Sequence, residues 1–245
     1  GSSTTTPATT PAADGTVKVD YTTSNGVATL SMTNTQVDDI ISQSQNGQAI
    51  LDLQAAGNTA AVNIPNNALS SFENANLDVA VRLPEGTATI NNEALASILA
   101  QAPNADLNLE LNTIPTNTLT AAQQAAVKSG DLVFDINILM GSKNITEFDG
   151  ALTIEVAYEG ELPAAVWYLN DEGELEKLDC TFKDGVVSFN LNHLSLYVVG
   201  KDETVIEDKW VNPFTDVKTD SWYYEAVKYV YEKDLMKGTS GTTFD

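Results

Sequence analysis

The chain has 245 residues and a formal net charge of −22, from 34 acidic and 12 basic side chains. Nucleic acids and anionic membranes are bound through basic patches that meet phosphates, and Arg82 is the only arginine, so both partners are excluded. The single cysteine, Cys180, excludes an internal disulfide and a cysteine-ligated zinc cluster.

The first segment, residues 1–15, reads GSSTTTPATTPAADG and has no apolar periodicity. Such a Ser/Thr/Pro tract buries too little apolar surface to offset the entropy lost on ordering. The sequence predicts a disordered linker here.

Residues 16–115 alternate short strands with short helices, and two stretches match each other at an offset of 26 residues, as Leu51 with Leu77 and Ala68 with Ala94 show. Each unit reads as a strand, a turn, a second strand and a helix that starts at an asparagine. A looser copy begins at Val27. Repeats of this kind stack to share a core that one unit cannot form alone, so we expect a strand–helix repeat region.

The helix of the second unit has the clearest signals. Asn92 is its predicted cap, and Leu95, Ile98 and Leu99 form its predicted buried face. Pro103 ends the pattern.

Residues 116–200 predict a β-sandwich-like module. A helix is expected over 118–129, because Thr120 and Gln123 form a capping box and Gly130 follows at its end. Apolar residues on every second position of 153–158, and turn signals at 170–173 and 183–185, then predict successive strands. They are expected over 132–140, 151–158, 164–169, 174–180, 185–191 and 195–199. The fold class predicted for the whole chain is mainly β with short helices (α+β), and residues 201–211 are a connector.

Residues 212–245 form the last predicted region, where aromatic residues gather. A helix is expected to start near Trp222, with Trp222, Ala226, Tyr229 and Val230 as one apolar stripe. Around this helix lie a Phe-x-Asp-Val segment and two glycines. The matching residues are Phe214, Asp216, Val217, Trp222, Ala226, Val227, Leu235, Met236, Gly238, Gly241 and Phe244.

This segment resembles an S-layer homology (SLH) motif of clostridial, Firmicutes-type surface proteins. The resemblance implies a secreted, extracellular protein at the cell wall, anchored to secondary cell-wall polysaccharide. It also implies a partial wall-binding site that includes Phe214, Asp216, Trp222 and Gly238.

The segment departs from the SLH pattern in two places. Asp234 stands where the family usually has glycine, and aspartate tolerates the left-handed conformation less well. The sequence ends at Asp245, before the second helix with its Thr-Arg-x-Glu signature, whose arginine suits an anionic sugar. We therefore expect complete SLH motifs to bind the polysaccharide and this fragment alone to bind it poorly.

Catalytic, metal-ligating and cofactor-binding residues are not expected. His193 is the only histidine, no Gly-x-Ser-x-Gly elbow is present, and the acidic clusters lack EF-hand spacing. The sequence therefore predicts a non-catalytic structural module of the cell surface. One alternative is an adhesin that binds host or microbial glycan or protein. Another is a domain that cleaves itself between Leu194 and Ser195, since His193-Leu194-Ser195 resembles known self-cleavage sites.

Overall fold

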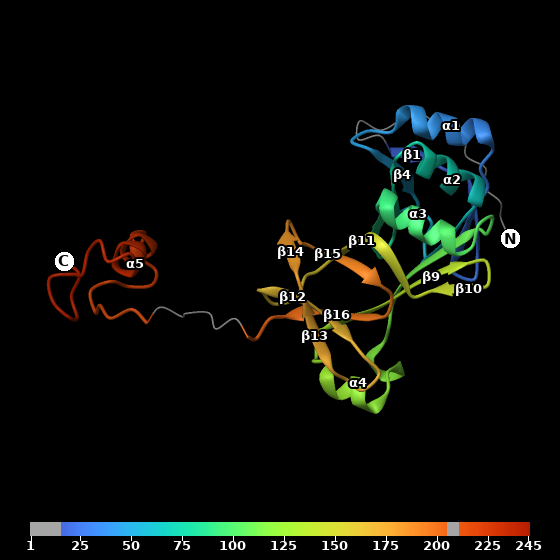
Figure 1. The fold of residues 1–245 in the computed structure, drawn as a ribbon. Helices are drawn as coiled ribbons and strands as arrows, with labels where there is room; N and C mark the ends of the chain where they lie inside the picture. The colour runs from blue at the N-terminus through green and yellow to red at the C-terminus, as the bar shows by residue number, and fades with distance from the viewer. Residues whose placement is uncertain (1–15, 205–210) are drawn as a thin grey trace. The chain divides into compact units, whose positions relative to one another are not determined.

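The computed structural model describes residues 16–204 and 211–245, with side chains from residue 19 onward. These residues fall into two compact units that divide between Asp202 and Glu203 (Figure 1). The predicted linker, residues 1–15, lies outside the described residues, as do residues 205–210 of the predicted connector. Each unit is described below by itself.

The first unit contains two mixed sheets. The strands of the seven-stranded sheet are β1 (Thr16–Lys18), β4 (Gln48–Asp52), β6 (Asp78–Leu83), β7 (Gly86–Ile90), β11 (Glu147–Ala157), β14 (Cys180–Lys183) and β15 (Val186–His193). Their order across the sheet is β1-β4-β6-β7-β11-β15-β14.

The nine-stranded sheet comprises β2 (Tyr21–Ser24), β3 (Val27–Leu30), β5 (Ala61–Ile64), β8 (Leu107–Thr113), β9 (Leu132–Met140), β10 (Lys143–Ile145), β12 (Ala164–Leu169), β13 (Leu175–Leu178) and β16 (Leu196–Lys201). Their order is β13-β12-β16-β9-β8-β5-β3-β2, and β10 pairs with β9. Parallel pairs join β1 to β4, β3 to β5 and β4 to β6. The predicted α+β class is confirmed.

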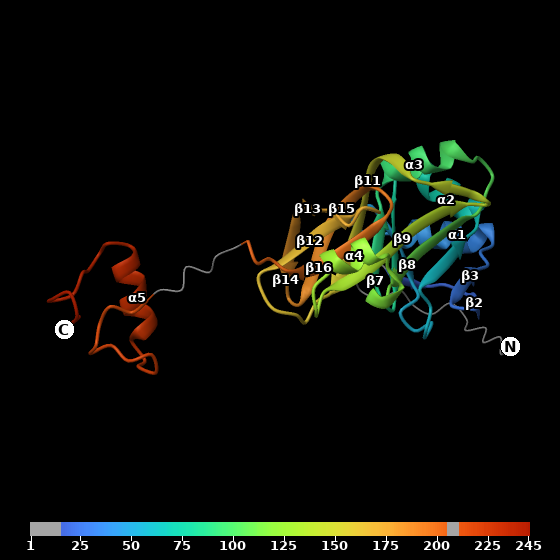
Figure 2. The same ribbon diagram turned by 90° about the horizontal axis from the view of Figure 1, so that it is seen from below.

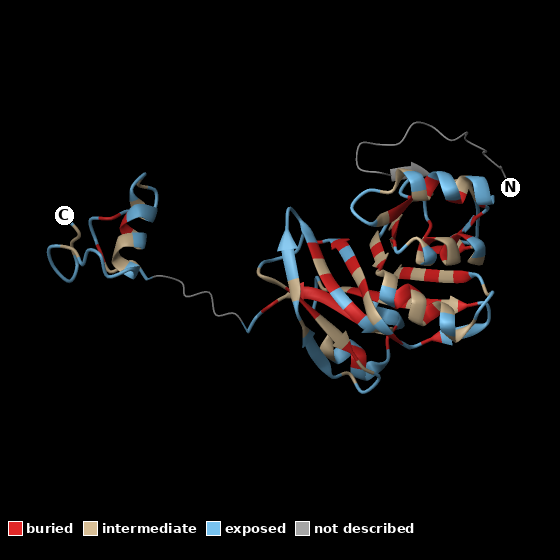
Figure 3. Ribbon diagram, turned by 45° about the horizontal axis from the view of Figure 1, so that its top comes forward, coloured by how far each residue is buried: buried red, intermediate tan, exposed pale blue. Residues whose placement is uncertain are grey.

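The main hydrophobic core of the first unit combines buried residues of both sheets and of three helices. Leu107, Leu109 and Leu111 alternate along β8 and are fully buried, because successive side chains of a strand point to opposite faces. Ile136 and Ile138 of β9 belong to the same core cluster. Buried and less buried residues alternate along many of the strands in Figure 3.

The predicted repeats appear as three strand–strand–helix units, ending in α1 (Asn34–Gln43), α2 (Asn66–Asn74) and α3 (Asn92–Gln101). These helices lie next to one another in chain order (Figures 1 and 2). The predicted cap of α3 is wrong by one residue. Asn91, not Asn92, lies at the N-cap with extended backbone, and its Oδ1 accepts the Ala94 N–H at 2.8 Å.

The helix predicted over 118–129 is shorter than expected. A 3₁₀ turn (η1, Thr116–Thr118) precedes α4 (Ala121–Ala126), and the capping box of Thr120 and Gln123 is present as predicted. The helix ends at Ala126 because Val127 takes an extended conformation and packs in a small cluster with Leu119, Val133, Leu169 and Val198.

Strands 132–140 and 164–169 are confirmed with those bounds as β9 and β12. The strand predicted over 174–180 is wrong, since β13 ends at Leu178 and Cys180 begins β14 in the other sheet. The predicted boundary at residue 115 runs through both sheets, because β7 pairs with β11 and β8 with β9. The division into a repeat region and a sandwich module stays a prediction.

The sheet edges follow a common pattern at both ends. The seven-stranded sheet begins at its edge strand β1 and ends at its edge strand β14. The nine-stranded sheet has β2 at one edge and β13 at the other. Strands β1 and β2 are consecutive in the chain, and so are β13 and β14. At each end a connection of one or two residues therefore passes from one sheet to the other, through Val19–Asp20 or through Asp179.

Candidate binding site in the C-terminal unit

The C-terminal unit is built around a small aromatic core. Phe214, Val217 and Val227 are buried, and the half-buried rings of Tyr231 and Phe244 pack against them. The Phe214 ring lies 5.1 Å from each of those two rings, in edge-to-face contact. The Phe-x-Asp-Val segment thus packs between the helix α5 (Tyr224–Glu232) and the end of the chain.

The apolar stripe predicted for this helix is wrong. Trp222 is 93% exposed and Tyr229 is 59% exposed. The helix begins at Tyr224, so Trp222 lies in the turn before it. Its inner face consists of Tyr224, Val227 and Tyr231, spaced at i, i+3 and i+7. The sequence carries two apolar stripes on this segment, and periodicity alone did not show which one faces the core.

Asp216 holds the final loop in place. Its carboxylate accepts the backbone N–H of Phe244, 3.0 Å from each oxygen, and the N–H of Asp245 at 3.1 Å. The backbone hydrogen bonds from Asp245 and Phe244 lower the pKa of Asp216, because they stabilise its charged form. The N–H of Thr215 donates to Thr242 O at 2.8 Å in the same contact.

Gly238 is required by space as well as by backbone conformation. Its φ is +82°, and a Cβ there would lie 2.5 Å from Thr243 O and 2.8 Å from Cε1 of Phe214. Asp234 also has a positive φ, of 58°, as expected for the residue that replaces a glycine. The N–H groups of Leu235 and Asp234 donate to Val230 O and Tyr231 O, which makes a Schellman motif at the helix end.

A hollow of about 670 Å³ opens beside this core. The Trp222 and Tyr223 rings meet edge to face with their centroids 5.5 Å apart. The hollow is lined by Asp216, Val217, Trp222, Tyr223, Val227, Met236, Phe244 and Asp245. An exposed aromatic face beside carboxylates suits a sugar, because rings stack on its C–H face and carboxylates accept its hydroxyl groups.

The four predicted site residues have different places in this geometry. Phe214 lies in the core and Gly238 in the turn against it, so both shape the unit. Asp216 and Trp222 line the hollow and are both exposed, and Trp222 is 93% exposed. Contact of these residues with polysaccharide stays a prediction. Tyr223 and Met236 also line the hollow and were not among the predicted site residues.

Residues 213–245 match the S-layer homology domain family. They form an SLH domain. An SLH domain implies a cell-surface location and an anchoring role. The packing of Phe214, the Asp216 contacts and Gly238 therefore belong to the scaffold of an SLH domain, and Trp222 belongs to its exposed face.

Outside the SLH domain, the structure gives His193 aromatic neighbours. Its Nδ1 lies 3.1 Å from the Tyr197 hydroxyl, which donates to the His193 carbonyl at 2.8 Å. The ring also meets Tyr168 edge to face, 4.9 Å between centroids. Burial raises the pKa of Tyr197, so its hydroxyl stays protonated and remains a donor.

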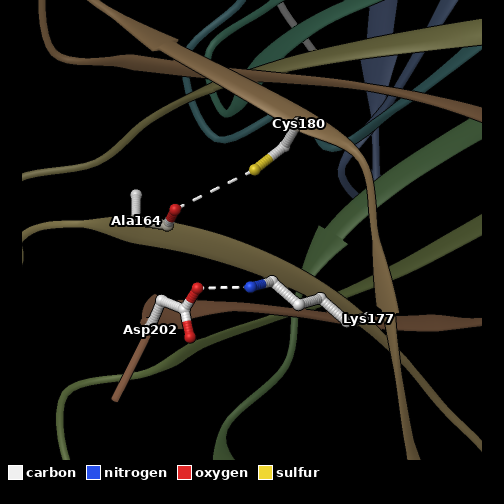
Figure 4. Close-up of polar contacts among 4 residues, drawn as sticks. All are labelled: Ala164, Lys177, Cys180 and Asp202. Carbon is white, nitrogen blue, oxygen red and sulfur yellow. Dashed lines mark hydrogen bonds and ion pairs between the residues drawn. The ribbon is translucent and has the colours of Figure 1, made fainter. Parts of the chain in front are cut away.

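Cys180 is half-buried at the start of β14, and its thiol points to the carbonyl of Ala164 at 3.9 Å (Figure 4). Desolvation raises the pKa of this thiol, which disfavours the thiolate. Within residues 16–204 and 211–245, no group of three or more His, Cys, Asp or Glu side chains is placed to hold a metal ion. No helix in the same part of the chain is long and apolar enough to cross a membrane.

Proposed function

We propose that the chain is a non-catalytic structural part of a bacterial cell-surface protein. Its SLH domain contributes to anchoring the parent protein to secondary cell-wall polysaccharide, and residues 16–202 hold a more distal part away from the wall. The match of residues 213–245 to the SLH family carries the proposal. The exposed Trp222 beside the hollow adds a surface of the chemistry that sugars require.

The experiment compares two proteins on purified cell-wall sacculi: the 245-residue chain, and the same chain lengthened by two complete SLH motifs. Each is sedimented with sacculi that carry the secondary polysaccharide and with sacculi stripped of it. We expect only the lengthened protein to be retained, and only on the polysaccharide-bearing sacculi. Equal retention on stripped sacculi would contradict the proposal.

Two variants of the lengthened protein test the role of the exposed ring. Trp222→Ala removes a side chain that is almost fully exposed, so it should leave the fold intact and lower retention. Lys228→Ala removes a charge from the same segment and should leave retention unchanged, because Lys228 does not line the hollow. Retention that does not depend on Trp222 would place the polysaccharide elsewhere.

The spacer role draws on the described surface of the first unit. Its exposed large hydrophobic residues are few, and all lie in or near β12 to β15: Leu162, Leu175, Phe182 and Val186. Each is far less exposed than Trp222. A mostly polar surface favours a spacer over an adhesin with an apolar docking face. A glycan array without free-amine sugars, probed with residues 16–202, tests the adhesin alternative, which predicts binding to one of its glycans.

A further inference from the structure

A second hollow, of about 520 Å³, lies in the first unit, where the N-terminal part of β11 and the C-terminal end of β15 meet α3. We call it the β11 cleft. It is lined by Ser97, Glu147, Phe148, Asp149, Asn192 and His193. Phe148 is buried and forms its apolar wall, whereas Glu147, Asp149 and Asn192 are exposed.

A β-bulge shapes the cleft. Glu147 of β11 pairs with His193 of β15, but the register shifts before the next pair at Leu152. Gly150 lies in this bulge with φ of +82°, packed so closely that a Cβ would lie 2.4 Å from the Ala94 nitrogen. Asn91 joins the bulge to α3, because its Oδ1 accepts the N–H groups of both Ala94 and Ala151.

Two side chains of α3 form hydrogen bonds with the β11 backbone that lines the cleft. The Asp149 N–H donates to Ser97 Oγ at 3.0 Å, and Gln101 Nε2 donates to the Glu147 carbonyl at 2.9 Å. A site whose backbone is fixed in this way loses little entropy when it orders around a ligand. The cleft is therefore pre-formed.

The side chains in the cleft offer acceptors that are not used. Among the described residues, the carboxylates of Glu147 and Asp149 and the side-chain amide of Asn192 form no hydrogen bond or ion pair with another part of the protein. The Tyr197 hydroxyl donates to the His193 carbonyl, so His193 Nδ1–H donates to Tyr197 and Nε2 is an acceptor in the neutral ring. The cleft therefore presents two carboxylates and further hydrogen-bond acceptors, and offers few hydrogen-bond donors to pair with them.

We propose that the β11 cleft binds a sugar that carries a free amino group, such as a glucosamine unit. An ammonium group forms charge-assisted hydrogen bonds with the two carboxylates. The ring hydroxyls pair with Asn192 and with Ser97, which also presents a hydroxyl. The net charge of −22 attracts cationic ligands and repels carboxylated sugars. The hollow is large enough for a small ligand, since ligand pockets measure about 300–1,000 Å³.

A metal ion fits this cleft less well than an amino sugar. No group of three or more His, Cys, Asp or Glu side chains in the described chain is placed to hold a metal, and those of the cleft are included in that statement. A sugar spans a wider set of groups than an ion does, so it can reach Asn192 and Ser97 as well as both carboxylates.

His193 makes the test specific, because it is the only histidine in the chain and gives a single set of imidazole signals in NMR spectra. The 245-residue protein is titrated with the β-1,4-linked dimer of glucosamine and, separately, with its N-acetylated form. We expect the free-amine dimer to shift the His193 signals to saturation and the N-acetylated dimer to leave them in place. Equal shifts from both dimers would overturn the proposal.

Variants separate the cleft from the general negative charge of the protein. Glu147→Gln and Asp149→Asn each remove one carboxylate from the cleft, and each should weaken binding of the glucosamine dimer about fivefold, as for a partly exposed charge pair. Glu155→Gln is the matched control, since Glu155 is exposed on the same strand but does not line the cleft. An equal loss with Glu155→Gln would show that binding is diffuse and would overturn the site.

Free lysine, titrated in the same way, supplies the amine without the sugar. Shifts as large as those of the dimer at equal concentration would overturn the sugar assignment. The cleft is monitored through His193 in the first unit, whereas wall retention is monitored through the SLH domain, so either proposal can fail while the other stands.

Discussion

The ammonium of Lys177 forms an ion pair with the carboxylate of Asp202, the residue at which the first unit ends (Figure 4). Asp202 is only 3% exposed, and its N–H donates to the Pro163 carbonyl at 2.8 Å. Lys177 belongs to the edge strand β13, and Asp202 follows β16. Because β12 lies between these strands, the pair fastens the edge of the sheet to the last residue of the unit.

Replacement of this buried carboxylate should destabilise the first unit. We expect Asp202→Asn to lower the free energy of unfolding by about 1–2 kcal/mol, less than for a fully buried pair because the Lys177 side chain is 47% exposed. Urea unfolding measures the change. The control is Glu161→Gln, which removes the exposed partner of Lys201 and should have little effect. A control loss as large as that of Asp202→Asn would refute the role of burial.

The bulge of β11 gives a second prediction. Gly150→Ala combines a positive φ with a clash against the backbone of α3, so we expect a loss of about 3 kcal/mol in unfolding free energy. Gly57→Ala is the matched control, since Gly57 has a φ of +66° but no atom from beyond its chain neighbours within 4 Å of the place that the new methyl group would take. It should lose only about 1 kcal/mol. Thermal unfolding of both variants would show whether the close approach to α3 matters.

A similar pair of glycines tests the SLH domain. Gly238→Ala should loosen the final loop, with a cost of about 2 kcal/mol, because the new methyl group meets Thr243 O and the Phe214 ring. Gly241→Ala should be neutral, since that glycine has open space around it. The rate of hydrogen exchange at the amides of Thr215 and Phe244 measures how often the final loop opens, because both N–H groups hold that loop. Equal exchange in the two variants would contradict the packing described for Gly238.

The SLH domain should also respond to acid through Asp216. The pKa of this carboxyl is lower in the folded domain than in the unfolded chain, where it is about 3.9, so its stabilisation is complete above that value. Stability is lost as the pH falls through the folded pKa, when the carboxylate no longer accepts the Phe244 and Asp245 N–H groups. The amide NMR shift of Phe244 follows the titration.

A variant assigns that acid response to one group. Asp216→Asn should remove most of the acid-induced shift of the Phe244 amide, whereas Asp220→Asn, at an exposed aspartate outside this contact, should preserve it. An unchanged acid-induced shift of the Phe244 amide in Asp216→Asn would show that another group is responsible.

The peptide bond between Leu194 and Ser195 should stay intact. The Leu194 N–H donates to Thr146 O at 3.1 Å and the Ser195 carbonyl accepts the Ile136 N–H at 3.2 Å. The backbone on both sides of this bond is therefore hydrogen-bonded to other segments of the chain. Neither has a left-handed backbone that would store strain. A denaturing gel of aged protein should show one band, identical to that of Ser195→Ala. A fragment that begins at Ser195 would establish self-cleavage.

Local signals carried much of the fold prediction. The capping box of Thr120 and Gln123, the offset of 26 residues between the repeats and the alternation along 132–140 all act within a short stretch of chain, and each corresponds to an element of the structure. The passage from β13 to β14 was missed because Asp179 turns the chain between sheets without a glycine or proline to mark it. Residues 16–115 and 116–200 contribute strands to both sheets. This depends on long-range strand pairing, which local sequence patterns do not show.

The SLH site shows the same limit. Asp234 was recognised as a residue in a glycine position from the resemblance to the SLH motif, and its positive φ agrees with that. The choice between the Trp222 stripe and the Val227 stripe depends on which one the distant Phe214 contacts, and that contact follows from tertiary structure. The β11 cleft was not predicted, since Glu147 and His193 are brought together only by the pairing of β11 with β15.

The chain enters the first unit through β1, which pairs three residues with β4 alone, and leaves it through β16, which pairs six residues with β12 and four with β9. If the protein is stretched between a wall anchor and a distal load, fewer hydrogen bonds resist at the entry than at the exit. Residues 16–18 would then detach from the sheet first, and the chain would extend on its N-terminal side. Strand β16, which leads to the SLH domain, would stay paired.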